Sequence, residues 1–407
     1  MEREKLFKKW DMHPEHEYDM EDTLSYTLDG EEMDIAFVFS GRNRGKSFEV
    51  CANLIADAWY DDKTFGYVRR TTPTNFEVEQ YFADKTEFIS DMTDGLFTTV
   101  IVEKGQIKLY GESVDDEGNI KPYKGKRIGY PLSLTKAGKK KSLQFPDMFN
   151  MLFEEVMTNE EPYISGEVSR LLNLYSTCKR HKGKDFKLWL ISNTVSQVCP
   201  YSAEWGLHFS QMKPDEIKLI KLYLGSYDQE GNEEYLIVGC HYLKNMDELT
   251  KEDKKKKRLR VRTGIANNSW DELHQYTTVD LSFMKQFKIE ETVVFEYDDI
   301  MIQGDIVIVP TNLIQCYLDE EVEPVKEEMP ILYMRKKTSE PHYFTRLYTN
   351  NVERFGEYIT KGYVLYYKID KAVDTLLKTG WVVGADNITM NNFNQILTQL
   401  QYLKSGF

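Results

Sequence analysis

The sequence has few of the features that mark secreted or membrane proteins. No uninterrupted apolar run approaches the length of a membrane-spanning helix, and the first ten residues lack the apolar core of a signal peptide. The five cysteines are scattered and show no short paired spacing, so neither a disulfide framework nor a zinc site is indicated. We therefore expect a soluble cytoplasmic protein with no membrane partner.

The chain also lacks internal repeats, long low-complexity segments and overall positive charge. Its net charge of −14 argues against a protein that coats nucleic acid with its whole surface. With 407 residues, of which 41% are hydrophobic, it is long enough to build two domains with ordinary cores.

A strand, a glycine-containing loop and a helix follow one another near the N-terminus. The apolar stretch Ile35–Phe39 reads as a strand, and apolar residues recur at helical spacing between Phe48 and Trp59. The loop between them contains Ser40, Gly41, Arg42, Asn43, Arg44, Gly45, Lys46 and Ser47. This order is typical of a phosphate-binding P-loop.

In such a loop, the backbone amides and the helix dipole would cradle the phosphates of a nucleotide along Gly41–Ser47. Lys46 would reach the β- and γ-phosphates, and the Ser47 hydroxyl would bind Mg²⁺. Ser40 stands where the pattern has its first glycine, although Gly41 can supply the flexible turn. The alternative is a chance Gly-Lys-Ser triplet, but the strand before it and the helix after it favour nucleotide binding.

Two acids end a second apolar run. Met148–Phe153 reads as a buried parallel strand, whose carboxyl end would deliver Glu154 and Glu155 to the same crevice. We assign Glu154 to Mg²⁺ through its water shell, and Glu155 to the attacking water as the catalytic base. The first acid is usually Asp, and two acids after a strand are often only a solvated strand end. The assignment therefore depends on the P-loop upstream.

A third apolar strand, Phe186–Ile191, ends in small polar side chains. If this strand lies beside the P-loop strand, Ser192 and Asn193 would sense the γ-phosphate. Serine and asparagine are also common turn formers, so an ordinary strand-to-loop cap explains them equally well.

Positive charge is concentrated in two runs. The stretch from Lys121 to Pro146 has eight Lys or Arg residues and no acid, and its end precedes the acid-bearing strand. We predict a flexible basic loop beside the nucleotide, in which the phosphate-binding side chains are Lys136, Lys139, Lys140 and Lys141. A second cluster lies between Lys254 and Arg262. Basic runs are usually solvated faces, but two of them in one ATPase favour a polyanionic partner.

The order of predicted elements indicates an α/β protein. Alternating strands and helices in the first part predict a parallel sheet with helices on both faces, interrupted by an antiparallel hairpin around Glu103–Gly105. We expect an ATPase domain over 1–245, a helical linker over 246–280 and a smaller α/β domain over 281–407.

Four segments together resemble the DNA-packaging ATPases of small tailed phages with protein-primed genomes, the phi-twenty-nine-like relatives of the large terminase subunits. The four segments are Ser40–Ser47, Tyr67–Thr71, Phe153–Glu155 and Ile191–Asn193. The arginine-bearing loop and the Val68-Arg69-Arg70-Thr71 strand end are the more specific signals. The likeness covers about residues 30–200 and is looser beyond them.

This resemblance implies an ASCE-type P-loop ATPase that uses ATP and Mg²⁺ to drive double-stranded DNA through the portal, or connector, protein of an empty procapsid. The protein would form a ring, expected to be a pentamer, and would work in the host cytoplasm and transiently on the portal. Whether a packaging RNA is a further partner stays open.

The resemblance also implies site residues beyond the loop and the acids. The trans-acting arginine of the family lies between the acid pair and the third strand, which selects Arg180, with Lys179 and Lys182 as neighbouring alternatives. Arg42 or Arg44 would contact phosphate.

The second domain would resemble a ribonuclease-H-like nuclease that has lost its metal-binding acids. One alternative is a terminase-type ATPase with an active two-metal nuclease, for which this half retains carboxylates. They are Glu296, Asp298, Asp299, Asp305, Asp370 and Asp374. Another is a nucleotide-binding scaffold without motor turnover, favoured by the off-pattern Ser40 and Glu154. A small-molecule kinase would leave the second domain unexplained.

Overall fold

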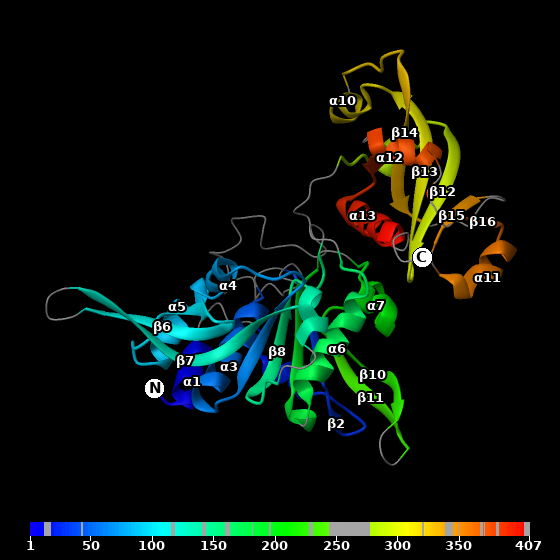
Figure 1. Ribbon diagram of the computed structural model, residues 1–407. Helices are drawn as coiled ribbons and strands as arrows, with labels where there is room; N and C mark the ends of the chain where they lie inside the picture. The colour runs from blue at the N-terminus through cyan, green and yellow to red at the C-terminus, as the bar shows by residue number, and fades with distance from the viewer. Residues whose placement is uncertain are drawn as a thin grey trace. The chain divides into compact units, whose positions relative to one another are not determined.

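The computed structural model divides the chain into two compact units (Figure 1). It describes residues 1–11, 18–41, 44–114, 119–140, 144–158, 163–180, 182–194, 197–227, 231–243, 277–319, 321–337, 345–349, 351–366, 369, 371–379 and 382–402. The first unit comprises Met1–Val156, Tyr163–Asn193 and Lys213–Asn267, and the second comprises Met157–Pro162, Thr194–Met212 and Asn268–Phe407.

The first unit is built on a nine-stranded mixed sheet in the described part of the chain. In spatial order its strands are β10 (Glu216–Tyr227), β11 (Glu233–Tyr242), β3 (Ile35–Ser40), β9 (Lys187–Asn193), β8 (Met148–Glu154), β4 (Thr64–Arg69), β7 (Ile120–Ser133), β6 (Gln106–Val114) and β5 (Thr99–Glu103). The strands from β11 to β7 run parallel. At one edge β10 pairs antiparallel with β11, and at the other edge β6 pairs antiparallel with both β7 and β5.

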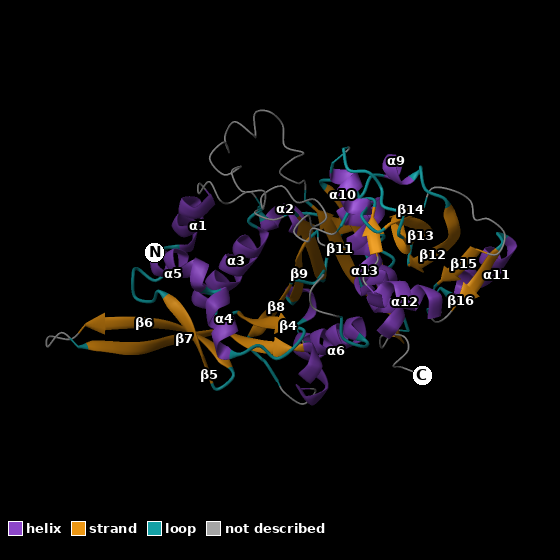
Figure 2. Ribbon diagram, turned by 90° about the horizontal axis from the view of Figure 1, so that it is seen from above, coloured by secondary structure: helices purple, strands orange, loops and turns teal. Residues whose placement is uncertain are grey.

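Helices cover both faces of this sheet. Figure 2 shows α3 (Lys46–Tyr60) and α6 (Glu167–Lys179) on opposite sides of β8 and β4. Ala36 and Val38 of β3 belong to the core shared with α3, because alternate side chains of a strand point to the same face. The other helices of the unit are α1 (Arg3–Asp11), α2 (Met20–Leu24), α4 (Asn75–Tyr81) and α5 (Thr86–Met92), and a short hairpin joins β1 (Thr27–Leu28) to β2 (Glu31–Glu32).

The second unit contains a six-stranded sheet. Its strands, in spatial order, are β16 (Tyr363–Tyr366), β15 (Thr345–Tyr348), β12 (Ile289–Tyr297), β13 (Ile300–Pro310), β14 (Glu328–Lys336) and β17 (Val382–Gly384). The middle strands β12, β13 and β14 form an antiparallel meander, and the remaining pairs are parallel. Its helices are α7 (Pro200–Trp205), α9 (Leu281–Met284), α10 (Leu313–Leu318), α11 (Phe355–Thr360), α12 (Lys371–Thr379) and α13 (Asn387–Tyr402).

The predicted alternation of strands and helices is confirmed, including the antiparallel hairpin formed by β5 and β6. The prediction of a flexible basic loop before β8 is wrong in one part, because Leu134–Lys140 forms a 3₁₀ helix, η2. Leu134 and Ala137 are buried in this helix, which explains why it is ordered. The predicted domain limits stay predictions, since residues 244–276 lie outside the described residues.

No helix within the described residues is long and apolar enough to cross a membrane. All five cysteines lie in the described part; they are buried, and no disulfide joins them.

Candidate nucleotide site

The loop after β3 leads directly into α3, as the sequence predicts. Gly45 precedes the helix with a φ of 76°, a left-handed conformation that glycine adopts without a steric penalty. Lys46 is the first residue of α3 and Ser47 the second, so both lie at the positive end of the helix dipole. Arg44 is buried, whereas Arg42 and Asn43 lie outside the described residues.

Lys46 and Asn193 are brought together by strand order. β9 lies beside β3, and Asn193 is the register partner of Ser40. The Lys46 ammonium is buried, donating a 2.9 Å hydrogen bond to Asn193 Oδ1 and a 3.3 Å hydrogen bond to the carbonyl oxygen of Gly41. Ser192 is buried and donates to the Asn193 carbonyl. The sensor candidate Asn193 therefore contacts the loop lysine.

Glu154 ends β8 as a buried carboxyl group next to α3. Burial raises its pKa, while the buried Lys85 ammonium and the hydroxyls of Ser47 and Tyr81 act in the opposite direction. Its Oε1 atom has no hydrogen-bond partner among the described residues. A buried carboxylate oxygen without a partner, facing a serine hydroxyl, fits a site that holds Mg²⁺ through its water shell.

Glu155 differs from Glu154 in exposure and in partner. Its φ is 55° and its side chain is 63% exposed, so the backbone turns it out of the strand and toward solvent. Arg69, at the end of β4, lies 2.7 Å from Glu155 Oε2 in an ion pair. The two adjacent acids therefore have separate environments, one buried beside α3 and one at the surface against an arginine.

Arg70 fixes the backbone that carries Glu155. Its guanidinium is fully buried, donates to the carbonyl oxygens of Glu155 and Val156, and pairs with Glu167 at 3.0 Å. Glu167 in turn accepts the backbone N–H of Ile164 at the start of α6. The acid-bearing turn is thus tied to a buried ion pair rather than left as a free loop.

The structure describes only some of the predicted DNA-binding lysines. Lys136 is exposed on η2, which begins directly after β7 at the carboxyl edge of the sheet, where Ser133 is the register partner of Arg69. The backbones of Lys139 and Lys140 belong to η2, and Lys141 lies outside the described residues.

Arg180 lies at the other edge of the same sheet. It caps the C-terminus of α6 and is exposed, and its neighbour Lys179 donates to Asp34 at 2.7 Å, just before β3 begins. Since the phosphate loop follows the other end of the six-residue β3, Arg180 is roughly 20 Å from the loop of its own chain. It does not join Lys46 and Glu155 within one subunit.

Five of the acids named for the nuclease alternative lie in two separate situations in the described residues: Asp298 and Asp299 lie next to each other beside His208, whereas Glu296, Asp305 and Asp374 do not join them in the described contacts. Asp305 is buried against Arg335, Gln303 and Thr292, and Asp374 pairs with Lys378 on α12. Glu296 is buried and accepts hydrogen bonds from Thr349 and Tyr358. Asp370 lies outside the described residues. A two-metal nuclease centre requires converging carboxylates, and these three acids instead have separate protein partners.

Four residues of this site have no role in the sequence-based prediction: Arg69, Arg70, Tyr81 and Lys85. The two arginines belong to the Val68–Thr71 strand end that carries the resemblance, so a signal was present without an assignment. No signal in the sequence marks Lys85 or Tyr81, because an amphipathic helical stretch does not reveal which polar group folds back toward a buried acid.

Comparison with known proteins assigns the chain to a family. Residues 18–226, which contain the loop, both acids and β9, match the family described as podovirus DNA encapsidation protein (Gp16). No curated protein matches the sequence.

The fold comparison finds three phage packaging proteins among the similar structures. The phi29 viral genome packaging motor assembly is 18% identical, with a TM-score of 0.43, over 95% of this chain and 98% of that one. The Phi-28 gp11 DNA packaging motor gives the same identity and coverage with a TM-score of 0.41. The Thermus phage P74-26 large terminase ATPase domain is 12% identical, with a TM-score of 0.31, over 61% of this chain and 94% of that one. On the family match, which spans more than half of its length, the chain belongs to the podovirus DNA encapsidation (Gp16) family.

Proposed function

We propose that this protein is an ATP-driven translocase that moves double-stranded viral DNA into an empty procapsid through the portal. The observation that carries the proposal is the convergence of Lys46, Glu154 and Asn193 at the carboxyl edge of one parallel sheet, within a chain of the encapsidation family. Ligands of open α/β sheets bind at that edge.

The strand order supports an ASCE-type P-loop ATPase. β9 is inserted between the loop strand β3 and the acid strand β8, and it ends in Asn193 beside Lys46. With β9 between them, the loop and the acid strand would flank the phosphates, the metal ion and the attacking water. The polar end of β9 would then face the γ-phosphate.

Each residue of the site has a chemical role in ATP hydrolysis. The helix amides and Lys46 would bind the phosphates, and Ser47 with Glu154 would hold Mg²⁺, which neutralises charge on the β- and γ-oxygens when bound. Glu155 would orient the attacking water and accept its proton. For this, its carboxylate must leave the ion pair with Arg69.

DNA contact is proposed for the η2 region. Lys136 is exposed there, and phosphate contacts suit a motor that must move any sequence, because they carry no sequence information. η2 follows β7 and packs on α6. The Thr135 N–H of η2 donates to the Arg70 carbonyl, and the Arg70 guanidinium holds the turn that carries Glu155. This contact gives a physical route from the acid turn to the DNA-binding segment.

A ring of subunits on the portal would complete the site. Arg180 is too far from the loop of its own chain to act there, and an exposed arginine at the opposite sheet edge suits a finger that reaches a neighbour's γ-phosphate. A pentamer is the expected size, and a packaging RNA stays open as a partner.

For the second unit we propose a ribonuclease-H-like fold without nuclease activity. Support comes from the meander β12–β13–β14, with β15 and β16 added in parallel beside β12. The buried Glu296 and Asp305 accept hydrogen bonds from their own neighbours, which leaves them poorly suited to hold a metal pair.

The decisive experiment measures ATP hydrolysis with and without long double-stranded DNA. We expect DNA to stimulate the unaltered protein, and Glu155→Gln to bind ATP but to lose roughly 10²- to 10⁴-fold in turnover, as for loss of a general base. Glu321→Gln, an exposed acid of the second unit, is the matched control and should keep full activity. Absence of turnover under every condition, including on procapsids, would favour a nucleotide-binding scaffold instead.

A further inference from the structure

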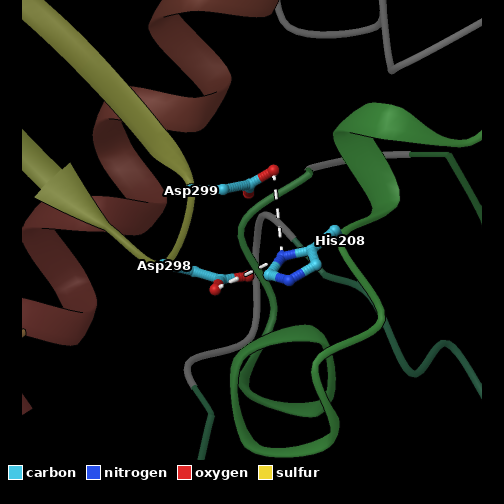
Figure 3. A group of neighbouring side chains, drawn as sticks. All are labelled: His208, Asp298 and Asp299. Atoms are coloured by element: carbon cyan, nitrogen blue, oxygen red, sulfur yellow. Dashed lines mark ion pairs between the residues drawn. The ribbon is translucent and has the colours of Figure 1, made fainter.

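A compact group of metal-ligating side chains lies in the second unit, away from the nucleotide residues. His208, Asp298 and Asp299 place one imidazole nitrogen and two carboxylate oxygens within 4.8 Å of one another. Figure 3 shows the two aspartates at the turn between β12 and β13, and His208 on the segment that faces this turn. All three residues belong to the second unit.

The distances within this group do not fit ordinary hydrogen bonds. His208 Nδ1 lies 3.7 Å from Asp298 Oδ1 and 3.9 Å from Asp299 Oδ2, whereas a protonated imidazole would approach a carboxylate oxygen to about 2.7–2.9 Å. The Nδ1 atom is nevertheless buried and has no hydrogen-bond partner among the described residues. A buried nitrogen that faces two carboxylates at ion-pair distance, beyond the reach of a hydrogen bond, leaves a position between the three atoms that suits a positive charge.

A divalent metal ion supplies that charge at a suitable size. Imidazole and carboxylate ligands lie about 2.0–2.2 Å from such an ion, so two ligand atoms that share it are roughly 3–4 Å apart. The His208 side chain is 41% exposed, which gives the ion a path from solvent. Two carboxylates and one imidazole are a mixed ligand set that first-row cations such as Mn²⁺ and Zn²⁺ accept.

The surroundings hold the ligands in place. Ser202 of α7 donates to Asp298 at 3.4 Å, and Gln211 donates to Asp299 at 3.1 Å. Such outer hydrogen bonds orient ligands around a metal ion.

We infer that His208, Asp298 and Asp299 bind a structural divalent transition-metal ion that joins the β12–β13 turn to the segment Thr194–Met212. This segment follows Asn193, the last residue of β9, and leads on to β10, yet it clusters with the second unit. The ion would therefore fix the chain that leaves the sensor strand onto the second unit. The inference does not depend on the proposed ATPase activity.

The test measures Mn²⁺ binding to the full-length, chelator-treated protein without nucleotide, by the loss of the free-ion paramagnetic resonance signal. We expect saturable binding of one ion per chain, weakened at least about tenfold in His208→Ala and Asp299→Asn. Asp374→Asn, an aspartate of the same unit outside the cluster, should bind like the unaltered protein. Ser47→Ala should also bind normally, which separates this ion from metal held at the P-loop.

Thermal unfolding shows whether a variant that fails to bind Mn²⁺ is still folded. In chelator, Asp299→Asn should unfold at the same temperature as the unaltered protein. Added Mn²⁺ should raise the unfolding temperature of the unaltered protein and of Asp374→Asn by several degrees, and leave that of Asp299→Asn unchanged. Equal Mn²⁺ affinity in the cluster variants, or no saturable binding by the unaltered protein, would overturn the inference and leave a simple ion pair.

Discussion

At the scale of single residues, the ion-pair partner of Glu155 bears on its proposed role as the catalytic base. Glu155 lies in an exposed ion pair with Arg69, and such pairs contribute about 0.2–1 kcal/mol. On the proposed function, this carboxylate must leave the pair before it can accept a proton from water. The pair would therefore act as a small barrier to hydrolysis while DNA is absent.

We predict that Arg69→Met raises DNA-independent ATP hydrolysis by up to about fivefold, the factor that corresponds to the upper end of the pair's contribution. Stimulation by DNA should shrink accordingly, and Arg69→Lys should behave like the unaltered protein. Steady-state ATPase assays with and without DNA measure both effects. If Arg69→Met instead lost activity a hundredfold, the arginine would have to assist catalysis directly.

A second residue-scale prediction concerns His241 on β11. Burial lowers the pKa of this imidazole to about 4, and its Nδ1 shares a hydrogen bond of 2.8 Å with the Thr23 hydroxyl. The unfolded chain, with an ordinary imidazole pKa near 6.5, binds protons more readily between these two values. Folding stability contributed by His241 is therefore complete above about pH 6.5 and decreases as the pH falls toward 4.

The free energy of unfolding should fall by roughly 3 kcal/mol over this pH range, because each pKa unit of the shift from 6.5 to about 4 corresponds to about 1.36 kcal/mol. Urea unfolding at several pH values, compared between the unaltered protein and His241→Asn, measures it. The asparagine variant should show a shallower pH dependence, since it cannot take up the proton. Parallel curves for the two proteins would contradict the prediction.

At the scale of secondary-structure elements, a buried ion pair joins β4 to α6. Arg70 follows β4 directly and pairs with Glu167 of α6, with both side chains at most 1% exposed. Removing one partner leaves an uncompensated buried charge, which typically costs 3–5 kcal/mol. The same arginine holds two carbonyl groups of the acid turn, so the loss would also loosen the backbone around Glu155.

We expect Arg70→Met to lower the free energy of unfolding of the first unit by about 3–5 kcal/mol. Glu167→Met alone should cost a similar amount, and the double variant should recover a large part of it, because neither charge then stays buried without its partner. Denaturant unfolding of the three variants gives the coupling energy. Strict additivity of the two single losses would show that the pair is not coupled.

At the scale of the whole molecule, the proposed function assigns different roles to the two ends of the parallel strands. Lys46 and Glu155 lie at the carboxyl edge and Arg180 at the amino edge, so on the proposed function Arg180 could reach a phosphate only in a neighbouring subunit of a ring. Activity should therefore depend on neighbouring subunits, as for an arginine finger supplied in trans.

We predict that Arg180→Ala subunits and Lys46→Ala subunits are each inactive alone and regain activity when mixed. At random mixing, roughly a quarter of the interfaces combine an intact loop with an intact arginine, and this fraction sets the expected recovery. The measurement is DNA-stimulated ATP hydrolysis after co-assembly on procapsids, with Lys5→Ala, an exposed lysine on α1, as the matched control. Full activity of assembled Arg180→Ala alone would exclude this arginine as the finger.

The sequence alone determined the parts that depend on local order. The loop before α3, the acids after β8 and the polar end of β9 are each motifs of fewer than ten consecutive residues. Strand and helix periods could be recognised because they repeat over neighbouring positions. The long strands β7, β10 and β11 were not predicted, since they lack a strict alternation of apolar and polar residues.

Only the tertiary structure decided which of these parts meet. Arg70 pairs with a residue 97 positions away, Lys46 with one 147 positions away, and His208 faces a turn formed some 90 residues later. Contacts over such distances depend on strand order and on the folding of both units, which no local pattern encodes. Hence Glu155 could be predicted as a base from the sequence, and that stays a prediction, whereas Arg69 as its partner, Arg70 as its anchor and the His208 cluster required the fold.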